Sequence, residues 1–173
     1  MRPELGYGLV AGAGMGGWLL LEYALGLHTR HLAAASYTHW GTELILVTML
    51  YLLLRRQLRR LNRYWLPVWE GVLYGSVASF VAALAFYVFA ATYLYFINPD
   101  WPDVRLAFDV AAMRDRGVPE EQVREYARLF RRAFSPVGLA VTIPVAYTVL
   151  GAVASSVLTL WVNWRHKERI HAG

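Results

Sequence analysis

Four long apolar blocks, separated by polar segments, constrain the fold of this chain more than any other feature of its sequence. Three of the blocks contain one charged residue each, and the fourth contains none. A helix of about 20 mostly apolar residues crosses the hydrocarbon core of a bilayer. The sequence therefore predicts an all-α integral membrane protein, a single four-helix domain over 1–173. The expected spans cover about 5–27, 36–54, 66–97 and 137–164.

The first block also begins near a basic residue, as the apolar region of a signal peptide does. It is longer than such a region usually is, so we expect it to remain in the protein as a helix. With 57% hydrophobic residues, the chain lies above the usual range of soluble domains. The net charge of +5 would suggest nucleic acid in a soluble protein. Here the positions of the arginines explain the charge, and no nucleic-acid partner is expected.

Five of the sixteen arginines lie between the second and third blocks with no acid among them, and an excess of Lys and Arg in short loops marks the cytoplasmic side. We therefore expect a protein of the bacterial inner membrane with both termini inside and the 98–136 connection outside. Tyr93 and Trp101 are expected among the aromatic residues of the outer interface. A second interpretation of the arginine run is that it binds anionic lipid headgroups or a lipid-linked phosphate. The run consists of Arg55, Arg56, Arg59, Arg60 and Arg63.

The 98–136 connection reads as a structured insertion of two helices. Pro102 and Asp103 mark the start of the first helix, and Gly117 marks its end. The second helix, which begins near Pro119, is strongly amphipathic. It is expected to lie on the membrane surface, cap the bundle or bind a partner. Its apolar face is formed by Val123, Tyr126, Ala127, Phe130 and Phe134.

The stretch GAGMGGW, from Gly12 to Trp18, has the G-x-G-x-x-G spacing of a dinucleotide-binding turn. That turn needs a preceding strand, and this stretch lies inside an uninterrupted apolar block. A four-residue spacing of small residues fits better, because small residues let helices approach closely in lipid. We expect these faces to pack within one bundle, with self-association or docking to another protein as the alternative. They are Gly8, Gly12 and Gly16, then Gly71, Gly75 and Ser79, then Gly151, Ser155 and Thr159.

Glu22, Glu43 and Glu70 are the acidic residues within the apolar blocks. Ionisable residues in a span suggest function by default. All three are expected near helix ends, which favours structural ion pairs or contact with interfacial water. The alternative is a small proton- or ion-coupled transporter, or a lipid flippase, that uses one of them.

Other chemistry finds little support in the sequence. His39 and Glu43 have a spacing compatible with zinc ligands, but this spacing is common by chance and no metal site is expected. His28 and His31 lie nearby on the same expected side. The chain contains no cysteine. Since no catalytic motif can be assembled, we expect no enzyme activity and no cofactor.

The insertion and its flanks are similar to an uncharacterised family of small four-helix bacterial membrane proteins. The similar motifs are Asn98-Pro99-Asp100, Gly117 with Glu120-Glu121-Gln122, and Ser135-Pro136, together with YGLVAG and GVLYGSVAS in the apolar blocks. The resemblance covers nearly the whole chain and implies a four-helix inner-membrane fold without an established activity. It also suggests a membrane glycosyltransferase acting on lipid-linked sugars as a partner.

The sequence thus favours a non-enzymatic accessory or scaffold subunit that binds another membrane protein. A lipid-phosphate glycosyltransferase is the expected partner class, with the arginine run placed near its anionic lipid substrate. Membrane lipids are expected as further partners. Self-association remains an alternative to a foreign partner.

Overall fold

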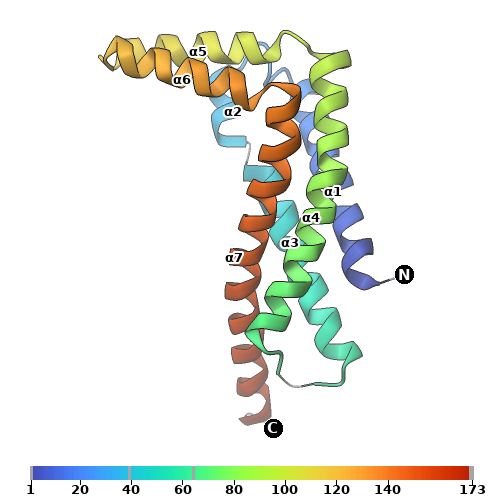
Figure 1. Cartoon of the computed structure of the whole chain (residues 1–173). Coiled ribbons are helices and arrows are strands. Elements are labelled where there is room, and N and C mark those ends of the chain that lie inside the picture. Colours follow the sequence, from blue (N-terminus) through green and yellow to red (C-terminus); the bar gives the residue numbers. More distant parts are fainter. Residues whose placement is uncertain (1, 39, 64, 172–173) are drawn as a thin grey trace.

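A computed structural model describes residues 2–38, 40–63 and 65–171, with side chains described as far as Arg165. Every regular element among these residues is helical. Four long helices form a bundle, and a helical hairpin projects from one end of it (Figure 1). The elements are α1 (Pro3–Ala24), α2 (Leu32–Thr38), α3 (Trp40–Arg60), α4 (Val68–Thr92), the π-helical turn η1 (Tyr93–Ile97), α5 (Trp101–Asp115), α6 (Glu120–Ala133) and α7 (Pro136–His171).

α1 packs on α4 through its glycine face. Gly8, Gly12 and Gly16 all lie against α4, and a Cβ atom at Gly12 would come within 2.5 Å of the backbone oxygen of Ala82. Because glycine has no side chain, the two backbones approach to the van der Waals contact on which helix association in lipid depends. The glycine face of α1 is therefore covered by a helix of its own chain.

The contact between α4 and α7, here called the α4–α7 seam, pairs glycines of one helix with hydroxyl residues of the other. Ser79 and Ser155 are fully buried in it. Small residues on both sides let the two helices run close together along much of their length. The facing pairs are Gly75 with Ser155, Gly151 with Ser79, and Gly71 with Thr159.

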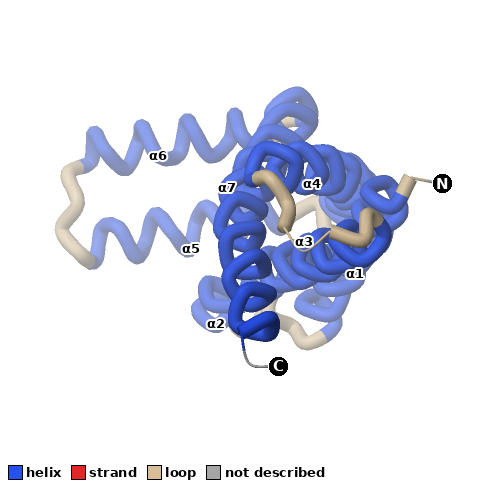
Figure 2. The backbone as a smooth tube through the Cα atoms, turned by 90° about the horizontal axis from the view of Figure 1, so that it is seen from below, coloured by secondary structure: helices blue, strands red, loops and turns tan. Residues whose placement is uncertain are grey.

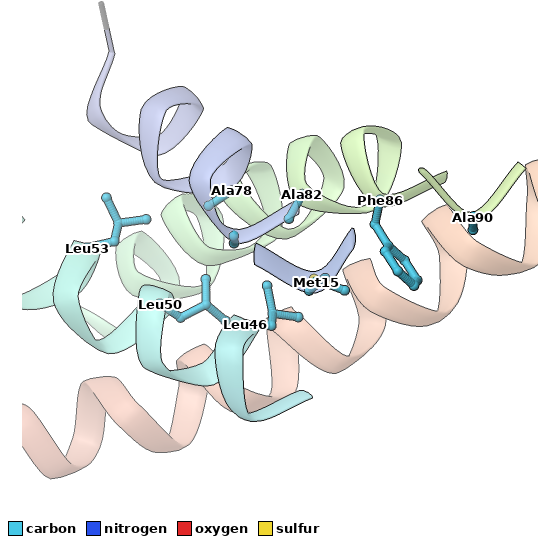
Figure 3. Packing of buried hydrophobic residues seen from close by; sticks show 9 residues of the cluster. Met15, Leu46, Leu50, Leu53, Ala78, Ala82, Phe86 and Ala90 are labelled. Carbon is cyan, nitrogen blue, oxygen red and sulfur yellow. The ribbon is translucent and has the colours of Figure 1, made fainter. Parts of the chain in front are cut away.

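Larger side chains fill the centre of the bundle on the side of α3. Leu46, Leu50 and Leu53 of α3 are buried beside Met15 of α1 and the alanines of α4 (Figure 3). They recur at three- and four-residue intervals, so they share one face of α3. Large residues on α3 thus complement the small residues on α1 and α4.

Two helices of the described chain are long and apolar enough to cross a membrane, by length and composition. One comprises α4 with η1 (Val68–Ile97), and the other is α7 over Pro136–Arg165. Each also exposes a row of large apolar side chains on its outer face. The exposed row of α7 is Val137, Val141, Val145, Val149, Val153 and Val157, and that of α4 is Leu73, Val77, Phe80, Leu84 and Val88.

The two other predicted spans do not meet the same measure. The six glycines of α1 dilute its hydropathy. α3 runs on from the apolar block to Arg60, so its last turns carry several arginines. The expected span over 36–54 also includes the end of α2, a separate short helix. A four-helix arrangement is therefore present, while two rather than four of its helices have the composition of a membrane span.

The α5–α6 hairpin, hereafter the arm, projects sideways from one end of the bundle (Figures 1 and 2). Gly117, at a φ of +72°, makes the turn after α5 that bulkier residues rarely adopt. An ion pair between Arg114 and Glu120, at 2.7 Å, bridges the turn. Its hydrogen bonds hold the pKa of the Glu120 carboxyl below its usual value. The predicted two-helix insertion is therefore present as an extended arm.

Candidate functional site

A cavity of about 510 Å³ lies where the arm meets the bundle. It draws its walls from α1, α2, α3, α4 and α7 and its roof from α5 and α6, so it depends on nearly the whole fold. Most of its polar lining is contributed by the bundle and by the first turns of α5. The lining residues are Leu19, Glu22, His28, Ala35, Ser36, Thr42, Glu43, Phe86, Trp101, Arg105, Asp109, Tyr126, Phe130, Phe134 and Tyr147.

A chain of buried polar groups begins in this cavity. Glu22 and His28 are 6% and 4% exposed, and their side chains approach to 3.6 Å between Oε2 and Nε2. The other ring nitrogen of His28 lies 2.6 Å from the Tyr93 hydroxyl. Asn98 donates a hydrogen bond of 2.7 Å to the same hydroxyl oxygen. The π-helical turn η1 positions Tyr93 for these contacts, and such turns are frequent at functional sites.

Two polar atoms at this cavity stay without a partner among the described residues. One is Oε1 of Glu22, and the other is Nε1 of Trp101. A buried acceptor or donor left unpaired costs roughly 1–3 kcal/mol, so nearly all such groups in proteins have partners. Here a carboxylate oxygen and an indole N–H both lack a hydrogen-bond partner in the described part of the chain. A further polar group bound in the cavity would be stabilised by bonding to them.

A second carboxylate, that of Glu43, faces the same cavity from α3. Thr42 donates a hydrogen bond of 2.9 Å to Glu43 Oε2. Tyr147 of α7 donates in turn to Thr42, at 3.3 Å. Glu22 and Glu43, which lie on different helices, are thereby brought to one site.

The roof of the cavity is tied to the bundle by Arg105 of α5. Its guanidinium pairs with Asp109 at 3.0 Å and donates to the Ser36 hydroxyl at 3.1 Å. Tyr126 of α6 donates a hydrogen bond of 2.8 Å to the same Asp109 carboxylate. Burial, and then this bond to Asp109, raise the pKa of Tyr126 to about 12. α2, α5 and α6 are thus joined by one network.

Carboxylates outnumber cationic groups in the cavity lining. Glu22, Glu43 and Asp109 supply three carboxylates, whereas Arg105 supplies the one guanidinium. That guanidinium is already paired with Asp109. Glu22 and Glu43 therefore have no guanidinium partner within this lining.

A second cavity of about 260 Å³ adjoins the first and is almost wholly apolar. The two share five lining residues, three of which are Phe86, Trp101 and Phe134. Beyond these, the second cavity runs between α4 and α7. Its further lining consists of Ala90, Tyr93, Leu94, Ala133, Leu139, Thr142 and Ile143. A polar chamber and an apolar chamber therefore lie side by side and share part of their walls.

The predicted membrane acids fall at two different ends of the molecule. Glu22 and Glu43 line the cavity near the arm. Glu70, in the first turn of α4, pairs with Arg63 at 3.1 Å at the opposite end. The three acids therefore do not form one site.

The amphipathic face of α6 divides between two surroundings. Val123 is buried between α5 and α6 in the arm itself. Tyr126, Phe130 and Phe134 line the cavity on the bundle side. The face predicted from the sequence thus serves both the hairpin and the cavity roof.

The arginine run lies at the end of α3 remote from the arm (Figure 1). Arg56 lies over the ring of Tyr7, 5.8 Å from its centroid, and lines a groove of about 400 Å³ together with Arg2. Arg63 is paired with Glu70. The other members are solvent-accessible to different degrees: Arg55 is half-buried, and Arg59 and Arg60 are exposed.

Of the histidines considered as metal ligands, His39 lies outside the described residues. His31 is exposed, and His28 is buried beside Glu22. In the part of the chain that the structure describes, no group of three His, Asp or Glu side chains gathers at metal-binding distance.

Several residues of the cavity were not predicted from the sequence to belong to a functional site. Tyr93 and Trp101 were expected at the membrane interface, and the structure buries the first and half-buries the second. Arg105, Asp109 and Tyr147 gave no signal of their own. The i,i+4 spacing of Arg105 and Asp109 is a usual helix-surface pair, and nothing in the sequence places it over a cavity.

Fold and site together define an all-α protein with two helices apolar enough to span a membrane, whose helical arm roofs a two-part cavity. The chain belongs to the family described as "Protein of unknown function (DUF4199)", which matches residues 6–162. The uncharacterised family expected from the loop motifs is thereby confirmed. Comparison with curated proteins and with solved structures gives no match.

Proposed function

We propose that this protein is a non-enzymatic accessory subunit of the bacterial inner membrane that binds another integral membrane protein through its arm. The observation that carries the proposal is a groove of about 510 Å³ lined by α5 and α6 alone. The arm projects sideways from the bundle, where a partner can reach it (Figure 2). The groove shares no lining residue with the cavity beneath the arm.

The composition of this groove resembles that of a protein interface. Its floor is apolar and includes Leu106, Val110 and Val123. Its rim is charged, as the rims of protein–protein interfaces are. The rim residues are Asp103, Arg114, Glu120, Arg124 and Arg131.

Membrane insertion is part of the proposal and rests on the exposed faces of two helices. α4 and α7 each expose a row of large apolar residues along their length. Contiguous exposed apolar surface marks a membrane or protein contact. The arginine run at the far end of α3 supports a cytoplasmic location for that end and an outer location for the arm.

The partner class that we propose is a lipid-phosphate glycosyltransferase. Arginine forks suit phosphate, and the groove beside Arg2 and Arg56 combines guanidinium groups with apolar walls from Val10 and Met49. Such a groove at the cytoplasmic end would hold an anionic lipid near the partner. Membrane lipids are therefore proposed as additional ligands.

The test is purification of the tagged full-length chain from its native membrane in mild detergent. We expect one integral membrane protein to co-purify in stoichiometric amount. Ala107→Arg places a bulky charge on an exposed position of the groove and should release this partner. Gln122→Arg, an exposed position of α6 outside the groove, should retain it. A monomer or homodimer without companions would overturn the proposal.

A second candidate, a small ion-coupled transporter or lipid flippase, is favoured by the meeting of Glu22 and Glu43 at one cavity. In this case Glu22→Gln and Glu43→Gln should abolish flux in liposomes without loss of folding. Glu70→Gln should leave flux intact, because Glu70 lies at the other end of the bundle. Equal flux in all three variants would exclude this candidate.

A further inference from the structure

We propose that the two-part cavity beneath the arm binds an amphipathic organic cation. Its ammonium head would lie between Glu22 and Glu43, and its apolar body would fill the adjoining chamber between α4 and α7. The larger cavity alone, at about 510 Å³, is within the roughly 300–1,000 Å³ typical of small-molecule sites. The site is distinct from the groove proposed for the protein partner, since the two share no lining residue.

Charge is the first argument for a cation. Of the three carboxylates in the lining, Asp109 is neutralised by Arg105, whereas Glu22 and Glu43 face no guanidinium there. Glu22 is 6% exposed, and its Oε1 has no hydrogen-bond partner among the described residues. A buried carboxylate oxygen of this kind is stabilised most by a positively charged donor, and charge-assisted bonds are about twice as strong as neutral ones. An anionic head would instead be repelled.

Aromatic rings around the polar chamber provide the second argument. The ring of Trp101 lies 5.3 Å from that of His28 and 5.5 Å from that of Phe134, measured between centroids. Phe86 and Tyr147, which pack edge-to-face at 5.6 Å, line the same chamber. Carboxylates flanked by aromatic faces are the usual surroundings of organic ammonium groups, which are attracted to the negative ring faces.

The adjoining chamber determines the rest of the ligand. Its walls include Leu94, Leu139 and Ile143, and its polar lining is negligible. An inorganic ion or a small hydrophilic amine would leave this chamber unused. An apolar body joined to the ammonium head would occupy both parts, which share Phe86, Trp101 and Phe134 in their walls.

The experiment measures binding to the purified full-length protein in dodecyl maltoside, which carries no charge. The probes are octylammonium, octyl sulfate and octyl glucoside, which share their chain and differ in head charge. We expect the cation to raise the thermal unfolding midpoint with saturation, and the other two to raise it far less. Equal stabilisation by octyl sulfate would overturn the proposal.

Variants then locate the site. Removing either carboxylate, by Glu22→Gln or Glu43→Gln, should weaken binding of the cation about tenfold, the effect of losing one charged hydrogen bond. Glu70→Gln is the matched control and should bind as the wild type does, because Glu70 pairs with Arg63 at the other end. Ala90→Leu, which fills the apolar chamber, should weaken binding without any change of charge. Unchanged affinity in Glu43→Gln and Ala90→Leu would overturn the assignment even if Glu22→Gln fails to fold.

Two sources of the ligand are distinguished by what the protein retains on purification. Mass spectrometry of the extracted ligands should find either an amine-headed lipid of net positive charge enriched over the bulk membrane, or a free organic cation. Either result supports the site when Glu43→Gln abolishes the retention. Retention that is independent of Glu43, or enrichment of anionic lipid at this site, would count against it. Failure to recover a protein partner in the earlier experiment would not affect this result.

Discussion

The α4–α7 seam and the cavity beneath the arm lie on the same helices but are built in opposite ways. In the seam, glycine and serine alternate across the contact, and Ser79 and Ser155 are fully buried. Near the arm the same helices carry Phe86 and Tyr147, whose large rings pack edge-to-face and line the cavity. Residue size along a helix thus determines where two helices close and where they leave space for a ligand.

The comparison extends to the polar groups. Hydroxyl groups in the seam fill space between backbones, and those of Ser79 and Ser155 have no partner in the described structure. The polar groups near the arm form a connected chain from Glu22 through His28 to Tyr93. We expect the seam to respond to side-chain volume and the cavity end to respond to hydrogen bonding and charge.

The largest effect is expected where a side chain is added to a glycine face. Gly12→Leu places a Cβ atom within 2.5 Å of the backbone oxygen of Ala82, which cannot move without displacing α4. We expect a loss of about 3 kcal/mol in stability, at the upper end of overpacking effects, or failure to fold. Thermal unfolding and size-exclusion chromatography in detergent measure it. Gly17→Leu is the control, because its Cβ would meet open space in the same helix. Equal midpoints for the two variants would contradict close packing of α1 on α4.

The next effect concerns the hydrogen-bonded chain at the cavity. Tyr93→Phe removes the hydroxyl that contacts both His28 and Asn98 and leaves these groups unpaired. The expected loss is about 1–3 kcal/mol in unfolding free energy. Tyr95→Phe, which makes the same chemical change on a 45% exposed ring, should have little effect. If both variants unfold like the wild type, the network does not stabilise this end of the bundle.

A smaller effect is expected from the network that attaches the arm. Burial and Asp109 raise the pKa of Tyr126 to about 12, above the value of about 10 for an unfolded tyrosine. Since the folded state holds this proton more tightly, the contribution of Tyr126 to stability is complete below pH 10 and is lost as the pH rises through about 12. In an ultraviolet titration, the step near pH 12 should be smaller in Tyr126→Phe by the contribution of one tyrosine. Tyr37→Phe, on a 79% exposed ring, should retain that step. A step of undiminished size in Tyr126→Phe would show that the bond to Asp109 is not formed.

The smallest effect is expected from a substitution in the α4–α7 seam. Ser155→Ala removes a buried hydroxyl without a partner, so the unfolding free energy should change by no more than about 0.5 kcal/mol, in either direction. Ser155→Val adds volume opposite Gly75 and should be clearly destabilising. A large loss in the alanine variant would mean that the hydroxyl, rather than the small size of serine, holds the seam together.

Helix positions and close-packed faces followed from patterns within single segments. Small residues at four-residue intervals from Gly8 to Gly16 predicted a packing face, and Gly117 and Pro119 predicted the turn of the arm. Two rather than four of the described helices have the composition of a membrane span, because glycines in α1 and arginines in α3 lower their hydropathy. Local patterns carry this information because helix periodicity and turn geometry involve neighbouring residues.

The cavity could not be predicted in the same way. Glu22, Glu43 and Asp109 are acidic residues of three different helices, and all three line the cavity. No local sequence pattern indicates that these helices meet at one end of the bundle. Tyr93 and Trp101 read as interfacial aromatics because residue type alone does not distinguish a ring in the headgroup layer from one that covers a buried histidine.

The sequence by itself determined an all-α chain with long apolar helices, their small-residue faces and a helical insertion before the last of them. Each of these depends on hydrophobic and steric preferences that act within one segment. The tertiary structure decided which helix covers the glycine face of α1, that Glu22 and Glu43 share a cavity while Glu70 does not, and that the arm roofs that cavity. These outcomes depend on the simultaneous packing of helices distant in the chain, where side-chain volumes and buried polar partners must be satisfied together.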